Sequence, residues 1–457
     1  MTDIASSLAD IVGRDSVVAG DALSDDYAHD EALGGVPCRP LAVVRPTSSD
    51  QVARLLRFAT ELRIPITARG AGTGLSGACV PRPGGLVVSF ERMNHILEID
   101  TENQTATVEP GVTLDALNAA VAQAGLLYPV HPGENSATLG GNVATNAGGM
   151  RAVKYGVTRH HVLGLEVVLA TGEVMRSGGK FVKTSSGYDL TQLIIGSEGT
   201  LALVTEVVVK LVPLLPARAT VLALFRTLDE AARAVPALLV TGVGPLMVEY
   251  IDRITMGIVT AQSGVELGVS TAAKAETEAY LLIEVEGRSE ARVDEDVEAA
   301  GGVLVEHGAI DVFVLPSTAA RQLIEAREKS FWAAKRAHAT EVVDVVVPRA
   351  ALPRYMEQVR AIAARHAAFI PGCGHAGDGN VHLAVFEPDE RKRDALLGDL
   401  FAAGQALGGV ISAEHGIGTV KKKHFMAHED AAKLALMRRI KLAFDPAGIL
   451  NPGTIFD

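Results

Sequence analysis

The chain has 457 residues, and several features that mark other classes of protein are absent from it or rare. No run of about 18 apolar residues occurs, so no membrane-spanning helix is expected. The first residues are acidic and lack the basic start of a signal peptide. Cys38, Cys79 and Cys373 are an odd, scattered set, which fits a reducing compartment and not a disulfide framework. These absences favour a cytoplasmic protein, with peripheral contact to the inner membrane face left open.

Basic clusters and aromatic residues are also scarce. The formal net charge is −12, and the short lysine run 421–423 is interpreted as a solvated helix face. Nucleic acid is therefore not expected as a partner. Aromatic residues make up only 4% of the chain, but 48% of it is hydrophobic, which at this length suffices for two or three cores.

What the chain has instead is glycine beside histidine and glutamate. Residues 374–382 carry His375 and His382, and the later segment Ser-Ala-Glu-His-Gly-Ile-Gly adds Glu414 with His415 directly beside it. Two imidazoles and one carboxylate form a three-ligand set that leaves an open metal position for a substrate. His415 is then free to move a proton, so the pattern indicates a catalytic site.

The first of these segments is predicted to be a glycine-rich turn that enters a β-strand. Apolar and polar residues alternate from Asn380 onward, so Asn380 and His382 should project from one face of the strand. The preceding glycines allow the chain to turn back and bring His375 near His382. The alternative interpretation is a turn with two ordinary histidines, because spacing alone does not prove a metal.

A second glycine-rich region lies near the N-terminus. Residues 64–68 are predicted to be a short strand, and the backbone N–H groups of the following loop, 69–77, can approach a pyrophosphate closely. The loop formally matches G-x-G-x-x-G, but Pro81 and Pro83 oppose the helix that a dinucleotide fingerprint requires. We therefore predict a phosphate-cradling loop between strands, not an NAD site; a purely structural turn is the alternative.

Two further segments, 138–149 and 196–201, are rich in glycine and small residues that give a flat or extended ligand access to the backbone. Between them, residues 163–174 are predicted to form two strands joined by a Thr-Gly turn. Loop-dense β structure would explain one such segment without a ligand. All the glycine-rich segments together favour a bound cofactor.

Four stretches together resemble the FAD-binding domain of the vanillyl-alcohol oxidase and p-cresol methylhydroxylase superfamily: residues 65–83, 139–149, 154–159 and 195–201. The His375/His382 and Glu414/His415 stretches, with Asn-Pro-Gly at 451–453, resemble the C-terminal part of its D-2-hydroxyacid dehydrogenase branch. That branch contains D-lactate dehydrogenases, glycolate oxidase catalytic subunits and D-2-hydroxyglutarate dehydrogenases. The resemblance extends over nearly the whole chain.

The resemblance implies a role for each matching residue. The implied FAD contacts are Arg69, Gly70, Ala71, Gly72, Thr73, Gly74, Leu75, Ser76, Gly140, Gly141, Asn142, Thr145, Asn146, Glu198, Gly199 and Asn451. The implied divalent-metal ligands are His375, His382 and Glu414, and His415 is the implied catalytic base. Arg327 is expected to hold the substrate carboxylate and Asn380 to contact the substrate. The alternative for Arg327 is an exposed charge on a helix.

Three departures from the family pattern refine these expectations. The pyrophosphate loop has no histidine at the position of covalent flavin attachment, so FAD is expected to be bound non-covalently. His131 stands where many relatives have an acidic residue. Val342 stands where the 2-hydroxyglutarate enzymes carry a lysine for the second carboxylate, which favours a monocarboxylate substrate.

The expected fold is α+β: a two-subdomain flavin-binding domain of the vanillyl-alcohol oxidase type, plus a substrate domain whose largely antiparallel sheet is covered by helices. Strands are expected at 221–225, 280–285, 342–347 and 381–386. The expected divisions are a helical N-terminal lead-in at 1–38, an FAD-binding domain at 39–216, a substrate and metal domain at 217–425, and a segment at 426–457 that packs back on the FAD domain.

The function expected from this resemblance is FAD- and metal-dependent oxidation of a D-2-hydroxy acid, D-lactate-like or glycolate, with hydride transfer to flavin N5. Zn²⁺ or Mn²⁺ suits the ligand set. The electron acceptor would be a quinone, a cytochrome or an electron-transfer flavoprotein, and a homodimer is the expected assembly. The alternatives are a D-2-hydroxyglutarate dehydrogenase, a metal-dependent hydrolase, or a non-catalytic flavin-binding subunit.

Overall fold

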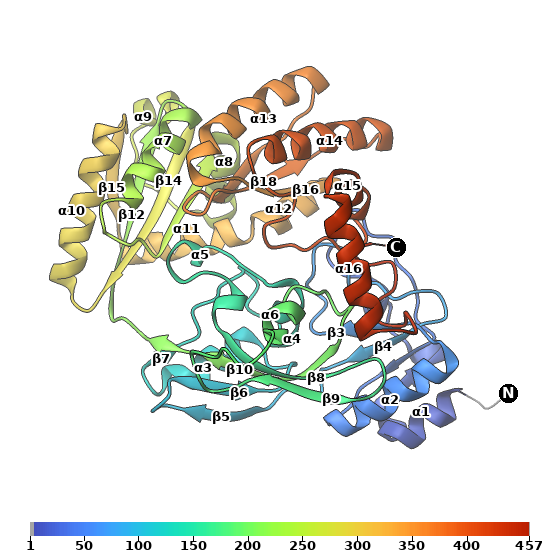
Figure 1. Cartoon of the computed structure of the whole chain (residues 1–457). Coiled ribbons are helices and arrows are strands. Elements are labelled where there is room, and N and C mark those ends of the chain that lie inside the picture. The colour runs from blue at the N-terminus through green and yellow to red at the C-terminus, as the bar shows by residue number, and fades with distance from the viewer. Residues whose placement is uncertain (1–3, 457) are drawn as a thin grey trace.

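The computed structural model describes residues 4–456 of the chain. It has two stacked halves, one built on two smaller sheets and the other on a single seven-stranded sheet (Figure 1). The first three residues of the predicted lead-in, and Asp457 of the C-terminal segment, lie outside the described residues. No helix within residues 4–456 is long and apolar enough to cross a membrane.

The first half begins with a four-stranded sheet in the order β1-β2-β4-β3. Its strands are β1 (Val17–Ala19), β2 (Ala42–Val44), β3 (Ile66–Arg69) and β4 (Leu86–Ser89). β2, β4 and β3 run parallel, whereas β1 pairs antiparallel with β2. The helices α1 (Ile4–Val12) and α2 (Ser49–Leu62) pack their apolar residues into the same core. The predicted lead-in therefore contains one α-helix and also supplies a strand to this sheet.

A five-stranded antiparallel sheet, in the order β5-β6-β10-β8-β9, completes the first half. Its strands are β5 (Ile96–Asp100), β6 (Thr105–Val108), β8 (Val162–Val168), β9 (Val174–Gly178) and β10 (Leu203–Lys210). The helices α3 (Leu114–Ala122), α4 (Leu139–Thr145) and α6 (Leu190–Ile194) share its apolar core. Nearby lie α5 (Ala152–Tyr155) and the two-stranded pair β7 (Leu126–Leu127) and β11 (Val212–Pro213).

The seven-stranded sheet of the second half is antiparallel throughout, in the order β15-β12-β14-β13-β17-β18-β16. Its strands are β12 (Ala217–Phe225), β13 (Met247–Asp252), β14 (Ala279–Gly287), β15 (Asp311–Leu315), β16 (Glu341–Val346), β17 (Gly372–His375) and β18 (Asn380–Val385). Side chains alternate between faces, so Val248 and Val343 enter the main apolar core while their neighbours Glu249 and Asp344 point the other way. One face of the sheet is thus apolar and the other carries buried charges.

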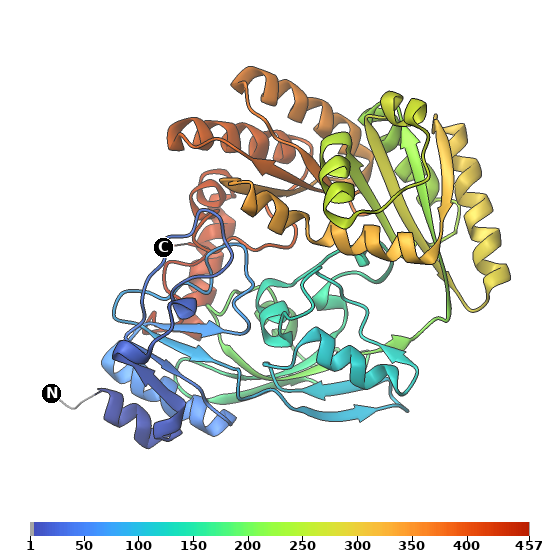
Figure 2. The same ribbon diagram turned by 180° about the vertical axis from the view of Figure 1, so that it is seen from behind.

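Helices cover both faces of this sheet (Figure 2). The apolar face packs against α7 (Leu228–Leu239), α10 (Glu290–Glu306), α13 (Leu352–His366) and α14 (Glu390–Ala406). The other face packs against α8 (Arg253–Ser263) and α11 (Ser317–Glu328), with α9 (Thr271–Glu276) and α12 (Ser330–Arg336) nearby. In Figure 2, α11 and α12 lie between the sheet and the first half of the chain. The charged face of the sheet therefore looks toward the glycine-rich loops.

The end of the chain returns to the first half after α15 (Lys422–His428) and α16 (Ala431–Phe444) (Figure 1). Ile449 and Leu450 enter the core of the four-stranded sheet, where Leu450 forms a parallel bridge with Ile66 of β3. Antiparallel pairing of β8 with β9 confirms the predicted Thr-Gly hairpin, and all four strands predicted for the second half are present.

Three features differ from the expectations drawn from the sequence. Lys421, expected on a solvated helix face, is only 2% exposed, and its Nζ atom lies 3.6 Å from Asp344 Oδ2. His375, expected in a turn, is the last residue of the strand β17, because Cys373 and Gly374 pair with β13 on one side. The glycine-rich segment after Thr138 includes the helix α4, which was not predicted. Thr138 Oγ1 accepts the N–H of Gly141 and caps this helix, which offsets the poor helix propensity of its glycines.

Candidate active site

A cleft lies between the two halves, and its empty space is about 1530 Å³, including the part open to solvent. Three glycine-rich segments far apart in the sequence border it, so the cleft suits an extended ligand. The predicted cofactor residues that line it are Arg69, Gly70, Ala71, Gly72, Thr73, Gly74, Leu75, Gly140, Gly141, Asn142, Thr145, Glu198 and Gly199.

The cleft wall formed by the first glycine loop consists largely of backbone. Within residues 4–456, the N–H groups of residues 70–75 have no hydrogen-bond acceptor. A Cβ added at Gly74 would meet only Asp30 Oδ2, at 3.5 Å, and one added at Gly199 would meet only Ala68 Cβ, at 3.7 Å. Unpaired backbone donors beside open space fit the pyrophosphate of a dinucleotide such as FAD.

Three predicted cofactor residues do not line the cleft. Asn451 Nδ2 donates a 2.8 Å hydrogen bond to the backbone oxygen of Glu198, which ties the end of the chain to the cleft wall. The backbone oxygen of Ser76 accepts the N–H of Thr419 at 2.9 Å. Asn146 ends α4 in a left-handed conformation, with φ of 53°. In this structure Asn451 and Ser76 connect the later part of the chain to the wall of the cleft, and Asn146 ends the helix that forms part of it.

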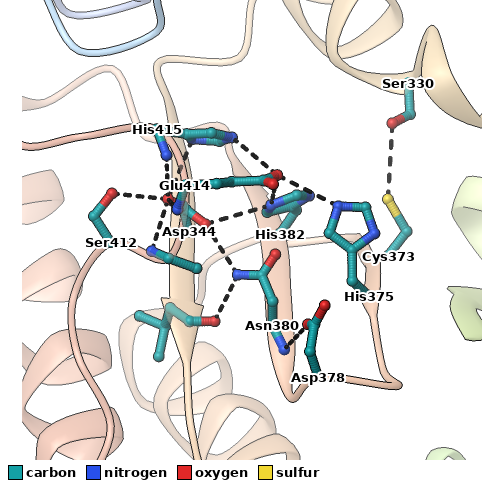
Figure 3. Close-up of polar contacts among 12 residues, drawn as sticks. Ser330, Asp344, Cys373, His375, Asp378, Asn380, His382, Ser412, Glu414 and His415 are labelled. Atoms are coloured by element: carbon teal, nitrogen blue, oxygen red, sulfur yellow. Dashed lines mark hydrogen bonds and ion pairs between the residues drawn. The ribbon is translucent and has the colours of Figure 1, made fainter. Parts of the chain in front are cut away.

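Four predicted side chains converge where β17 and β18 meet the loop 412–418 (Figure 3). His375 Nε2 lies 3.3 Å and His382 Nε2 lies 3.2 Å from the same atom, Glu414 Oε1. The rings of His382 and His415 are stacked, with centroids 5.0 Å apart. Glu414 and His415 also line the cleft, so this cluster opens onto the proposed cofactor space.

Asp344 on β16 is fully buried and organises the loop that carries Glu414. Its Oδ2 atom accepts the backbone N–H groups of residues 413–415 at 2.9–3.1 Å and the Ser412 hydroxyl at 2.8 Å (Figure 3). Its Oδ1 atom accepts Asn380 Nδ2 at 2.9 Å. Asn380 is buried, does not line the cleft, and holds Asp344 in this structure.

Glu249 on β13 is a second fully buried carboxylate at the cluster. Antiparallel pairing sets Glu249 opposite His375, and Glu249 Oε1 lies 2.6 Å from His375 Nδ1. Glu249 Oε2 lies 2.7 Å from Arg327 Nη2, an ion pair that lacks the alignment of a hydrogen bond. Arg327 is only 4% exposed, which argues against the alternative of an exposed helical charge.

Burial and neighbouring charges shift the pKa values of this cluster in opposite directions. Burial opposes a charged His375, but the carboxylates of Glu249 and Glu414 outweigh it and raise the pKa of His375 well above its usual value. Burial also opposes a charged Glu414, but the attraction of the His375 and His382 imidazoles outweighs it and lowers the pKa of Glu414. At His415 burial dominates and lowers the pKa to about 4, so this imidazole is neutral at pH 7.

The donor set fits a divalent metal. Ligands about 2.0–2.2 Å from a tetrahedral ion lie about 3.3 Å from each other, which matches the distances from both imidazoles to Glu414. His382 Nε2 is buried and has no hydrogen-bond partner within residues 4–456. Within the described residues, the potential ligands whose donor atoms all lie close together are Asp344, His382, Glu414 and His415, a group that leaves out His375. The oxygens of Asp344 already accept several N–H donors, so His375 stays the expected third ligand beside His382 and Glu414.

Glu198 connects this cluster to the cofactor cleft. Its buried carboxylate accepts the N–H groups of Ile417 and Gly418, both at 2.8 Å, from the loop that carries Glu414. Burial raises the pKa of Glu198 to about 7, even though these N–H groups favour the charged form. The loop 412–418 is thus held by one carboxylate from each half of the molecule.

Glu249 and Asp344 belong to no motif recognised in the sequence, and the contact of Glu198 with the loop 412–418 is visible only in the structure. A signal for the first two was present in the sequence. Each is a single carboxylate inside an apolar strand, in Met-Val-Glu-Tyr-Ile and in Val-Val-Asp-Val-Val. A charge in such a run is costly unless it has partners, and the structure supplies those partners.

Two protein families match most of the chain. Residues 40–178 match the family described as FAD binding domain, and residues 214–455 match FAD linked oxidases, C-terminal domain. The chain is 52% identical to an uncharacterized FAD-linked oxidoreductase of Mycobacterium tuberculosis, with 100% of this chain and 99% of that protein covered.

Relatives with more specific names are more distant. Glycolate oxidase subunit GlcD of Bacillus subtilis is 39% identical, with 99% of this chain and 97% of the relative covered. A D-lactate dehydrogenase of Anaerostipes hadrus is 37% identical, with 96% and 94% covered. The structure of p-cresol methylhydroxylase with substrate bound superimposes with a TM-score of 0.80 at 18% identity, covering 99% of this chain and 96% of that one. This likeness confirms the predicted fold.

Proposed function

This chain belongs to the FAD-linked oxidases, in the group of D-lactate dehydrogenases, glycolate oxidase subunits and D-2-hydroxyglutarate dehydrogenases, and we propose that it oxidises a D-2-hydroxy monocarboxylate to the 2-oxo acid. One observation carries the proposal. The two imidazoles of His375 and His382 converge on Glu414 directly beside the glycine-lined cleft, with the neutral His415 at the same wall.

When bound, FAD would supply the two-electron acceptor, and a divalent ion on His375, His382 and Glu414 would supply a Lewis acid for the substrate hydroxyl. Zn²⁺ or Mn²⁺ suits these ligands. The glycine loop 69–76 would hold the pyrophosphate through its unpaired N–H groups. FAD would be non-covalent, and acid or denaturant should release it from the polypeptide.

The chain's own residues would position the substrate and move one proton. The buried Nε atom of Arg327 has no hydrogen-bond acceptor within residues 4–456, whereas Nη2 faces Glu249. Nε and the guanidinium charge would bind the substrate carboxylate. His415 would take the hydroxyl proton at Nε2, because its low pKa leaves the ring neutral at pH 7. Asn380 would act on the site through Asp344.

The surroundings of the site support a monocarboxylate. Phe331 and Trp332 of α12 line the cleft with their rings edge to face, at a centroid distance of 5.4 Å. Val342 lies two residues before Asp344 on the same face of β16 and offers no charge to a second carboxylate. Burying an unpaired carboxylate there would cost several kcal/mol. D-lactate, glycolate or a longer apolar D-2-hydroxy acid therefore fits better than D-2-hydroxyglutarate.

Anaerobic titration of the FAD-loaded protein tests the reaction directly. D-Lactate should bleach the flavin absorbance, whereas L-lactate should leave it unchanged. Chelation should abolish this reduction without releasing the flavin, and added Zn²⁺ or Mn²⁺ should restore it. Reduction at the full rate in metal-stripped protein would remove the metal from the proposal. No reduction by any 2-hydroxy acid would remove the whole proposal.

A comparison of kcat/KM values with an artificial electron acceptor tests the substrate class. D-Lactate and longer apolar D-2-hydroxy acids should exceed D-2-hydroxyglutarate by more than tenfold, about 1.4 kcal/mol. A preference of that size for D-2-hydroxyglutarate would show that a cation elsewhere in the site holds the distal carboxylate, despite the uncharged Val342. For the physiological acceptor we propose a quinone, a cytochrome or an electron-transfer flavoprotein.

A further inference from the structure

The carboxylate of Glu249 touches both parts of the proposed active site at once. Its Oε1 atom lies 2.6 Å from His375, one of the metal ligands, and its Oε2 atom lies 2.7 Å from Arg327, the substrate arginine. We propose that Glu249 is a positioning residue that couples metal binding to substrate binding. This inference rests on the proposed function, because it assigns Glu249 a task within that site.

The fold fixes Glu249 in this place. β13 lies between β14 and β17, and its register sets Glu249 directly opposite His375 on the charged face of the sheet. The helix α11 packs on the same face, and Arg327 in its last turn lies beside Glu249. Glu249 is 0% exposed, so bulk solvent does not screen its charge. A buried carboxylate in such a place needs both of its cationic partners.

The contact with His375 decides which nitrogen can bind a metal. When Nδ1–H donates to Glu249, the lone pair of the imidazole is at Nε2, and Nε2 is the atom that lies 3.3 Å from Glu414. A carboxylate in this position also makes the imidazole a stronger ligand. Glu249 thus orients His375 toward the ligand set from the side opposite Glu414.

The contact with Arg327 sets the direction of the guanidinium. Nη2 is held by Glu249, and Nη1 donates to the Ser330 hydroxyl at 3.3 Å. With Nη1 and Nη2 engaged in this way, Nε is the guanidinium atom that is buried and has no partner in the described chain. Because one carboxylate orients both groups, a change at Glu249 should weaken metal binding and substrate binding together.

The test is Glu249→Gln in the FAD-loaded protein. Glutamine keeps the size of the side chain and can accept from His375, but it carries no charge for Arg327. The dissociation constant for Zn²⁺, measured by competition with a chromophoric chelator, should rise by about tenfold or more. At saturating metal, KM for D-lactate should rise while the flavin content stays unchanged. Glu249→Asp, which keeps the charge, should recover part of both losses.

Glu286→Gln is the matched control. Glu286 is a buried carboxylate on the same face of the neighbouring strand β14, and it contacts neither His375 nor Arg327. Its substitution should leave the Zn²⁺ affinity unchanged. A Glu249→Gln protein with normal Zn²⁺ affinity and KM, or with only one of them altered, would overturn the coupling. If Glu249→Gln does not fold, the Glu249→Asp protein decides, since its Zn²⁺ affinity and KM must then both be weakened.

The outcomes also separate this inference from the proposed function. If the unmodified protein fails to bind Zn²⁺ or to transfer electrons from D-lactate, the proposed function fails first. If the unmodified protein binds Zn²⁺ and transfers electrons from D-lactate, and the Glu249 variants do so equally well, only the role of Glu249 is wrong.

Discussion

The glycine-lined cleft and the charged cluster beside it make binding sites by opposite means. The cleft is formed from continuous loops, and the loop 70–75 offers backbone N–H groups that nothing in the described chain accepts. The cluster is formed from side chains on separate strands, and each charge in it has a partner, as Glu249 and Asp344 show. A site formed by backbone N–H groups tolerates side-chain substitutions that do not enter the cleft. In a buried charge network, each substitution removes more than one contact.

The largest effect should come from breaking the cluster while the cleft stays intact. His415→Ala removes the proposed proton acceptor, so kcat should fall by about 10²–10⁴-fold. The FAD content should not change, because the glycine loops are untouched. Steady-state kinetics with D-lactate and the flavin absorbance of the same sample check both statements. His428→Ala, at the end of α15, is the control and should keep full activity.

The converse experiment breaks the cleft and spares the cluster. Gly74→Val adds a side chain at the cleft wall, where the first added carbon would meet only Asp30, at 3.5 Å. The apoprotein should therefore fold, but the dissociation constant for FAD should rise at least about tenfold, roughly 1.4 kcal/mol. Zn²⁺ affinity of the apoprotein should stay within twofold of the unmodified apoprotein.

The control for this substitution is Gly302→Ala on α10, where an added Cβ would meet no atom within 4 Å. Its FAD affinity should match that of the unmodified protein, measured by fluorescence quenching on reconstitution. Equal FAD affinity in Gly74→Val would show that the loop does not border the cofactor.

The same contrast explains what the sequence could predict. The glycine loops and the pair His375 and His382 are local patterns, and the structure brings these two histidines to Glu414 as predicted. The contact between Glu249 and His375 joins residues 126 positions apart, and it depends on the strand β13, which was not predicted. Local periodicity contains no information on which strands become neighbours, so the supporting carboxylates could not be placed.

A smaller effect is expected from the buried ion cluster that joins the two halves. Glu286 on β14 accepts the Tyr155 hydroxyl at 2.6 Å and lies 3.1 Å from Lys154 Nζ and 3.3 Å from Arg218 Nη2. Glu286→Gln removes the negative charge that these buried donors face. It should lower the free energy of unfolding by about 1–3 kcal/mol at pH 7. Thermal melts of the two proteins in the same buffer measure the difference.

The pH dependence of this loss follows from the pKa of Glu286. Burial opposes its charged form, but the Tyr155 hydroxyl and the Lys154 ammonium outweigh burial and lower the pKa below the ordinary 4.5. A lowered folded pKa gives stability that is present above the unfolded value and disappears as the pH falls through the folded value. The difference in free energy of unfolding between the unmodified protein and Glu286→Gln should therefore be largest at neutral pH and shrink below about pH 4.5. A gap that grows with acid would contradict this assignment.

The smallest effect should come from an ion pair with the same chemistry on the surface. Glu276 lies 3.0 Å from Arg226, but their side chains are 56% and 57% exposed. Water solvates both charges, so the pair gains little from its attraction and is screened by salt. Glu276→Gln should change the free energy of unfolding by no more than about 0.5 kcal/mol, with no dependence on FAD or metal. Urea titrations of Glu276→Gln and Glu286→Gln should be run side by side. Both variants remove one carboxylate that faces an arginine, so a difference between their losses of stability reports the effect of burial. A loss at Glu276 as large as that at Glu286 would mean that net charge, not buried partners, governs the stability of this half of the molecule.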